Sequence, residues 1–252
     1  MNATQFWQFG HSMGAIEETI LEITTTAPNQ TFEWKNVVGN VVAYDWNGIV
    51  NKSNTHTFQK SGTYTIKIIG NISHFKANSP LVTKIIRVAA SINSFNQTFY
   101  NCTNLTSIPS ELFHKNVNAT DLSLVFFGCT GLTSIPSELF HKNVNAYNFS
   151  YCFSNCTGLT SIPSELFHKN VNVTDLSLVF SGCTGLTSIP SELFHKNVNA
   201  TKFSSCFYNC TGLTSIPPEL FYKNVKVYDF SYCFYKCTEI ALISEGLFNK
   251  SI

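Results

Sequence analysis

Residues 129–158 read CTGLTSIPSELFHKNVNAYNFSYCFSNCTG, and almost the same string recurs before and after them. When the copies are aligned on the isoleucine of LTSIP, they step by 27 residues without insertion or deletion. A period between 20 and 50 residues is typical of repeats that stack into an array or solenoid. The six aligned isoleucines are Ile108, Ile135, Ile162, Ile189, Ile216 and Ile243.

Apolar residues recur at fixed positions within every copy and predict the interior of the array. A single 27-residue copy buries too little apolar surface to offset the conformational entropy lost on folding, so each copy needs its neighbours. The positions predicted to be internal are, in the first copy, Cys102, Leu105, Ile108, Leu112, Phe113, Val117, Leu122 and Phe126.

Composition excludes several classes of partner. The formal net charge is +1 and only 12% of the residues are charged, so no electrostatic attraction to nucleic acid or to an anionic membrane is expected. No stretch approaches the roughly 20 apolar residues of a membrane-spanning helix, so no membrane insertion is expected. Residues 1–15 have neither a basic nor an apolar stretch of the secretory type, so no signal peptide is visible.

The nine cysteines are predicted to be free and buried. Six occupy one repeat position, from Cys102 to Cys237 in steps of 27, and three stand four residues before a member of that series. Their spacing differs from the C-x-x-C of zinc sites, and their number is odd. A small buried hydrophobic residue fits this context. Disulfides or a metal site are the alternative.

Two polar positions also repeat. Asparagine recurs as Asn116, Asn143, Asn170, Asn197 and Asn224, and is expected to form a ladder that satisfies main-chain groups at a bend. Histidine recurs as His114, His141, His168 and His195, with Tyr222 in fifth place. We interpret the histidines as an exposed structural row; a metal-binding or pH-sensing role is the alternative.

The first ninety residues carry strand signals. Residues 20–26, 31–46 and 55–72 are rich in alternating and β-branched residues and are interrupted by Gly, Asn and Pro. Asp45-Trp46-Asn47-Gly48, His56-Thr57-Phe58 and residues 61–66 (SGTYTI) resemble the turn and strands of PKD-type β-sandwich modules. This resemblance implies an immunoglobulin-like spacer or adhesion module over residues 18–71. The turn lacks the family's second acidic residue, so the resemblance carries no calcium site, and an unrelated small β-domain is the alternative.

The repeats resemble a second family. Residues 126–136 (FFGCTGLTSIP) follow the pattern F-x-x-C-x-x-L-x-x-I-P, which is similar to BspA-type leucine-rich repeats of surface proteins. The resemblance covers residues 92–252 and implies a non-enzymatic protein of attachment or interaction, exposed on a cell surface or a virion. Within each repeat, LTSI is expected to form a strand, and SELFHK is expected to form a short helical turn that begins at the preceding proline.

These observations predict a mainly β fold with short helices. A small β-sandwich-like domain of residues 1–90 is expected to precede a leucine-rich-repeat solenoid of residues 91–252. Ile252 falls within a copy, at the position of Val117, so we expect a homo-oligomer or an assembly partner to cover the C-terminal copy.

No catalytic, cofactor or metal site is predicted, because every candidate group follows the period of the repeat. The most uniform surface is the strand face, and it is the candidate binding site. We expect either a rigid spacer or assembly element that presents an attachment module, or an adhesin that binds a protein or a repetitive glycan through many weak contacts. The candidate residues are Thr106, Ser107, Thr133, Ser134, Thr160, Ser161, Thr187, Ser188, Thr214 and Ser215.

Overall fold

The computed structural model describes residues 16–248, and that range is all-β, with no helix. Its regular strands all precede the repeats, in the region where the sequence predicts them. The predictions for residues 1–15 and for Ile252 lie outside the described residues. The strands are β1 (Glu18–Thr25), β2 (Gln30–Glu33), β3 (Lys35–Trp46), β4 (Ile49–Asn51), β5 (Thr55–Phe58), β6 (Gly62–Lys76) and β7 (Val82–Arg87).

The strands form two antiparallel sheets. One has five strands in the order β4-β3-β6-β1-β7, and the other pairs β2 with β5. Aromatic side chains fill the space between them: Phe32 of β2 makes an edge contact with Trp46 of β3 at 6.3 Å, and Trp46 stacks on His56 of β5 at 5.6 Å. Trp34 and Trp46 are fully buried. Large aromatic areas thus supply the core of a region whose strands are mostly short.

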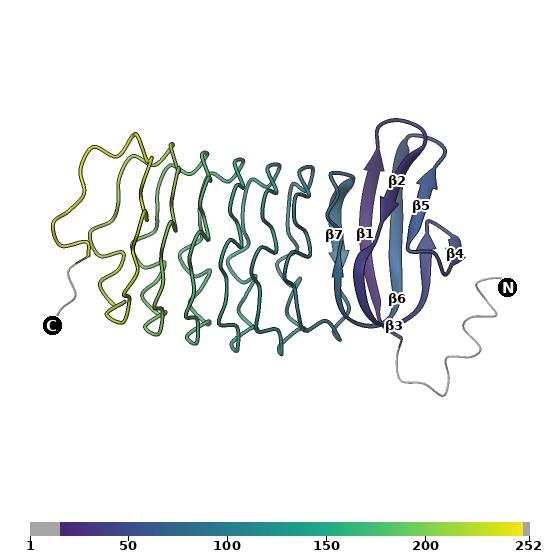
Figure 1. Cartoon of the computed structure of the whole chain (residues 1–252), viewed down its shortest axis with the longest axis horizontal. Coiled ribbons are helices and arrows are strands. Elements are labelled where there is room, and N and C mark those ends of the chain that lie inside the picture. The colour runs from purple at the N-terminus through teal and green to yellow at the C-terminus, as the bar shows by residue number, and fades with distance from the viewer. Residues whose placement is uncertain (1–15, 249–252) are drawn as a thin grey trace.

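The repeats follow as turn-rich layers that lie side by side along the long axis of the molecule (Figure 1). Each layer contributes a return segment, which we define as residues 94–101 and their equivalents at steps of 27. Successive return segments are joined by isolated parallel bridges rather than by continuous strands. The bridges are Ser94–Asp121, Asp121–Asn148, Asn148–Asp175, Asp175–Lys202 and Lys202–Asp229.

Hydrogen bonds between return segments run in one direction. Within one segment, alternate N–H groups donate to carbonyls of the next layer, as from Leu122 to Asn148 at 3.0 Å and from Leu124 to Ser150 at 3.0 Å. Some N–H groups between them close turns within the layer, as from Phe127 to Leu124 O at 3.2 Å. After its first residue, each return segment therefore has a donor edge toward the C-terminus and an acceptor edge toward the N-terminus. At the start of the segment the direction is reversed, as from the Asp175 N–H to Tyr147 O in the preceding layer at 3.2 Å.

This conformation requires two residues with positive φ in each return segment. One of the two positions is Asn101, Gly128, Asn155, Gly182 and Asn209 in successive layers, residue types that tolerate positive φ. Layers alternate here because a Cβ on Gly128 would lie 2.0 Å from the Asn101 Oδ1 atom. The asparagine of one layer thus occupies the space left by the glycine of the next.

The predicted fold class is wrong in two respects. The described residues contain no helix: SELFHK forms successive turns with i to i−3 bonds, such as Leu112 N–H to Pro109 O and His114 N–H to Glu111 O. LTSI is not a strand, so the leucine-rich-repeat solenoid with its continuous parallel sheet is not formed, and Ile135 and Ile162 are not partners across adjacent strands. A stretch of six residues between prolines and turns is too short to stabilise a helix, and local turns prevail.

Most predicted interior positions are buried, but one is not. At the seven other predicted positions, the residues are at most 9% exposed through residue 221. The valine position, from Val117 to Val225, is 43–49% exposed in every layer. Periodicity shows that a position is equivalent from copy to copy, but it does not show which way the side chain points.

The β-region and the repeats share one continuous core. Phe75 of β6 contacts Phe99 at 5.8 Å, and Phe99 begins a column of rings at 5.5–5.8 Å spacing that continues through Phe126 to Phe234. The Ala77 N–H, just after β6, donates to Thr98 O at 2.8 Å. The predicted boundary near residue 90 is therefore crossed by packed side chains and by main-chain hydrogen bonds.

Candidate functional site

The candidate surface consists of two exposed rows of hydroxyl side chains. Within each layer the threonine and serine stand between two buried residues, as Thr133 and Ser134 do between Leu132 and Ile135. All ten predicted residues are exposed: Thr106, Ser107, Thr133, Ser134, Thr160, Ser161, Thr187, Ser188, Thr214 and Ser215. The structure thus brings the ten residues together in two rows, although the main chain beneath them is not a strand.

Glycine sets the close approach of layers beside these rows. The Gly131 N–H donates to Thr103 O at 2.9 Å, and a Cβ on Gly131 would lie 2.6 Å from that carbonyl. Near the other end, the Thr214 hydroxyl donates to Thr187 O at 3.5 Å. The rows offer uncharged donors and acceptors at a regular spacing, which suits weak, repeated polar contacts.

The asparagine ladder is present as predicted. Asn143 is fully buried, and its Nδ2 group donates to Phe113 O at 3.2 Å and to Asn116 O at 2.8 Å in the preceding layer. Asn170, Asn197 and Asn224 repeat the arrangement, and Asn116 bonds to carbonyls that link β7 to the first layer. These side chains stabilise the turns and are unavailable to a ligand.

The histidines are less exposed than predicted. All four are half-buried, and the Nε2 atoms of His114 and His195 lie 3.1 and 3.0 Å from the carbonyls of Glu138 and Glu219 in the next layer. Among residues 16–248, no group of three His, Cys, Asp or Glu side chains is placed to hold a metal ion. His114 and His195 therefore act as contacts between layers, whereas the Nε2 atoms of His141 and His168 are buried without a hydrogen-bond partner.

The thiols are buried and free, as the spacing predicted. Burial raises the pKa of Cys102 and of Cys183 to about 12. Cys129 and Cys156 have pKa values raised well above the usual value for the same reason, with nearby cysteines adding to the effect. A neutral thiol is a poor nucleophile, so these residues serve packing rather than covalent chemistry.

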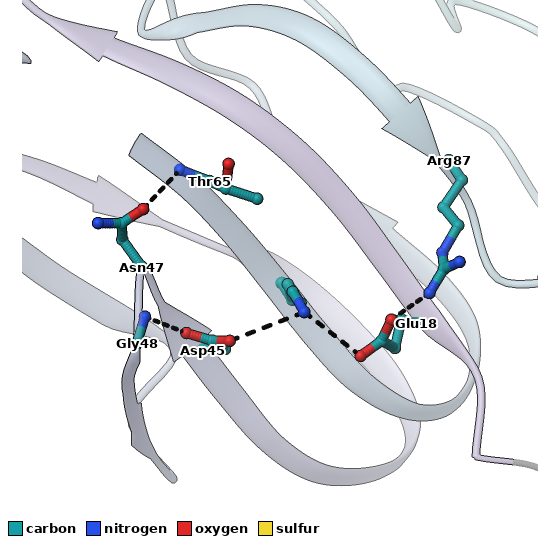
Figure 2. A network of polar contacts seen from close by, with 7 residues as sticks. Glu18, Asp45, Asn47, Gly48, Thr65 and Arg87 are labelled. Atoms are coloured by element: carbon teal, nitrogen blue, oxygen red, sulfur yellow. Dashed lines mark hydrogen bonds and ion pairs between the residues drawn. The ribbon is translucent and has the colours of Figure 1, made fainter. Parts of the chain in front are cut away.

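A hydrogen bond and ion pairs surround the turn of residues 45–48 (Figure 2). The Gly48 N–H donates to the Asp45 Oδ1 atom at 2.6 Å, and the Lys67 ammonium lies 3.9 Å from the same carboxylate and 3.6 Å from Glu18. Arg87 also bonds to Glu18. The Asp45 carboxylate thus accepts a bond within its own turn and faces the Lys67 ammonium.

A feature that the sequence reasoning missed lies at the C-terminal end of the layers. A shallow apolar hollow there is lined by residues that include Phe221, Phe230, Leu247 and Phe248. Tyr222, Tyr228, Tyr232 and Tyr235 are all more than half exposed around the last layer. The signal was available in the sequence, because residues 230–234 repeat the string FSYCF of residues 149–153.

Comparison with known proteins adds no assignment. No protein-family model matches the chain, and no curated protein is significantly similar to it. Within residues 16–248, no helix is long and apolar enough to cross a membrane.

Proposed function

We propose that this protein is a non-enzymatic structural and interaction protein of a cell surface or virion. Its layers act as a rigid spacer or assembly element that holds the N-terminal β-region, a PKD-like attachment module, at a fixed distance. The observation that supports this best is the single core from Phe75 to Phe234, because a hinge between β-region and layers would require those ring contacts to break.

Removing two whole layers tests the spacer. Deletion of residues 130–183 joins Cys129 to Thr184 and leaves an identical TGLTSIP string at the junction. Asparagine and glycine alternate from layer to layer at the position of Asn101 and Gly128, and they pack against each other. Removing two layers rather than one keeps this alternation. The spacer proposal expects a folded chain whose maximum dimension in X-ray scattering falls by about 10 Å. A chain that keeps its length, or collapses, contradicts it.

The two exposed hydroxyl rows support a second candidate, an adhesin for a repetitive glycan. Many weak contacts in line gain affinity through multivalency, so affinity should depend steeply on the number of layers. Sedimentation with insoluble cellulose, chitin and peptidoglycan separates the two candidates. If the protein is an adhesin, its affinity for the polysaccharide should fall at least tenfold on deletion of residues 130–183. If it is a spacer, neither the full chain nor the deletion variant should bind the polysaccharide through the rows.

A further inference from the structure

Along the outer edge of the last return segment, residues 229–236, four main-chain N–H groups have no acceptor within the described range 16–248. In the five preceding layers, four N–H groups donate to the next layer, as do those of Phe203, Ser205, Phe207 and Asn209. In the last layer, the equivalent N–H groups meet no acceptor among the described residues. By the register of the preceding layers, their acceptors would be carbonyls of one further layer. The four groups are those of Phe230, Tyr232, Phe234 and Lys236.

The side chains of this edge match an interface that already exists inside the molecule. Residues 149–153 and 230–234 share the string FSYCF. The inner copy is covered by residues 175–182, and its Phe149 and Phe153 are fully buried. In the outer copy, Phe230 and Phe234 are only partly buried, although Phe248 packs against both rings at 5.0 and 6.4 Å. The outer copy therefore has the same donors and rings as the inner copy, but no segment equivalent to residues 175–182 packs on it among the described residues.

We propose that this edge binds an extended segment of a partner polypeptide, which adds one further layer to the stack. The inner interface defines the chemistry of that segment. In residues 175–182 (DLSLVFSG), the carbonyls of Asp175, Ser177, Val179 and Ser181 accept the four hydrogen bonds. The side chains of Leu176 and Phe180 fill the space over the neighbouring rings. A partner segment needs the same alternation of free carbonyls and apolar side chains, a form of strand addition.

Because this edge carries N–H donors, a second copy of the chain cannot cover it in either of two simple arrangements, edge to edge or end to end. Two C-terminal edges facing each other would bring N–H groups against N–H groups. The opposite end of the stack, which carries the acceptor carbonyls, is covered by the β-region: Thr98 O accepts the Ala77 N–H, and Ser94 O lies 3.1 Å from the His74 Nδ1 atom. Of the two expectations from the sequence, the edge therefore favours an assembly partner over a homo-oligomer.

A labelled peptide tests the proposal on the full chain. The probe is residues 173–183 (VTDLSLVFSGC) with Cys183→Ser, carrying fluorescein, and its anisotropy is measured during titration with the protein. We expect saturable binding, weakened at least tenfold by Phe234→Asp and by Tyr232→Glu. Val117→Asp, at an exposed position of the first layer, is the matched control and should leave binding unchanged. Circular dichroism must show the wild-type spectrum for every variant used.

Three outcomes would overturn the proposal. The first is no saturable binding, or equal binding of a scrambled peptide. The second is binding that neither folded edge variant weakens. The third is a concentration-dependent dimer of the chain in light scattering that Phe234→Asp abolishes, which would make a second copy the occupant. The spacer proposal is tested separately, since the scattering measurement on the shortened chain involves no peptide.

Discussion

At the scale of single residues, the layers depend on a few polar side chains in apolar surroundings. Each buried asparagine of the ladder connects two layers through its Nδ2 group, as Asn143 does by donating to Phe113 O and Asn116 O. Buried polar groups that lose a partner are costly because water cannot replace it. The asparagines therefore contribute stability in a way that their position on a turn does not suggest.

Replacement of Asn143 by alanine tests this. Phe113 O and Asn116 O each lose a hydrogen bond inside the core, so we expect the free energy of unfolding to fall by about 1–3 kcal/mol. Urea denaturation followed by circular dichroism measures the change. Asn145→Ala, two residues away on the surface, should have an effect below about 0.5 kcal/mol. Equal effects of the two substitutions would contradict the ladder.

Replacement of Gly128 by alanine tests the alternation of layers. Gly128 has φ of 69°, and the new Cβ would lie 2.0 Å from the Asn101 Oδ1 atom. Positive φ in a residue with a Cβ and the displaced side chain together should lower the free energy of unfolding by about 1–3 kcal/mol. The control is Gly246→Ala, where no atom lies within 4 Å of the added Cβ. A Gly128→Ala protein as stable as the control would show that the close contact does not exist.

At the scale of elements, each layer is held by turns and by hydrogen bonds to both neighbouring layers rather than by strands. The series of buried cysteines belongs to this element, since the thiol of Cys156 donates to Phe126 O in the preceding layer at 3.1 Å. Cys129, Cys183, Cys210 and Cys237 repeat the contact. The small thiol lets neighbouring layers approach while it satisfies a carbonyl.

The thiols predict a loss of stability at high pH. The folded chain binds these protons more tightly than the unfolded chain, because burial raises the pKa of Cys102 and Cys183 from about 9 to about 12. The contribution of these thiols to the free energy of unfolding is thus complete below about pH 9 and is lost as the pH rises toward 12. The urea midpoint should fall from pH 8 to pH 10.5, and less steeply in Cys183→Val. An equal slope in that variant would contradict the assignment.

The sequence predicted which residues are equivalent better than it predicted their conformation. The strict period identified the buried positions of Leu132 and Cys129 and the exposed pair Thr133–Ser134, because burial follows from apolar residues repeated in register. It did not reveal that LTSI lacks a strand partner or that Val117 points outward. Those features depend on positive φ in the return segment and on the direction of its hydrogen bonds, and an unusual residue at positive φ such as Leu124 gives no sequence signal.

At the scale of the whole molecule, β-region and layers form one body with two different ends. The N-terminal end of the stack is covered by β6 and the residues after it, whereas four N–H groups of residues 229–236 have no acceptor among residues 16–248. The asymmetry gives the molecule a direction, because the β-region lies at one end of the stack and the last layer at the other (Figure 1). A spacer that joins two different partners needs such a direction.

The stability of the whole should depend on the number of layers. Because each layer contacts only its neighbours, deletion of residues 130–183 removes two layers and their interfaces without changing those that remain. We expect a cooperative unfolding transition in which the free energy of unfolding falls less steeply with urea concentration than in the full chain, since less surface becomes exposed on unfolding. Thermal and urea unfolding measure it. An unchanged denaturant dependence would mean that the deleted layers were not part of the folded body.

The central claim is that a residue lies beside its equivalent 27 positions away, and paired cysteines measure this most directly. Thr187 and Thr214 are exposed and in contact, and the native thiols are buried. Mild oxidation of the Thr187→Cys/Thr214→Cys protein should give an intramolecular disulfide, detected by mass spectrometry of its peptides. The Thr160→Cys/Thr214→Cys protein should give none, because two layers separate its cysteines by about 10 Å, beyond disulfide reach. Equal cross-linking of both pairs, or cross-linking of the second alone, would contradict the stacking of layers.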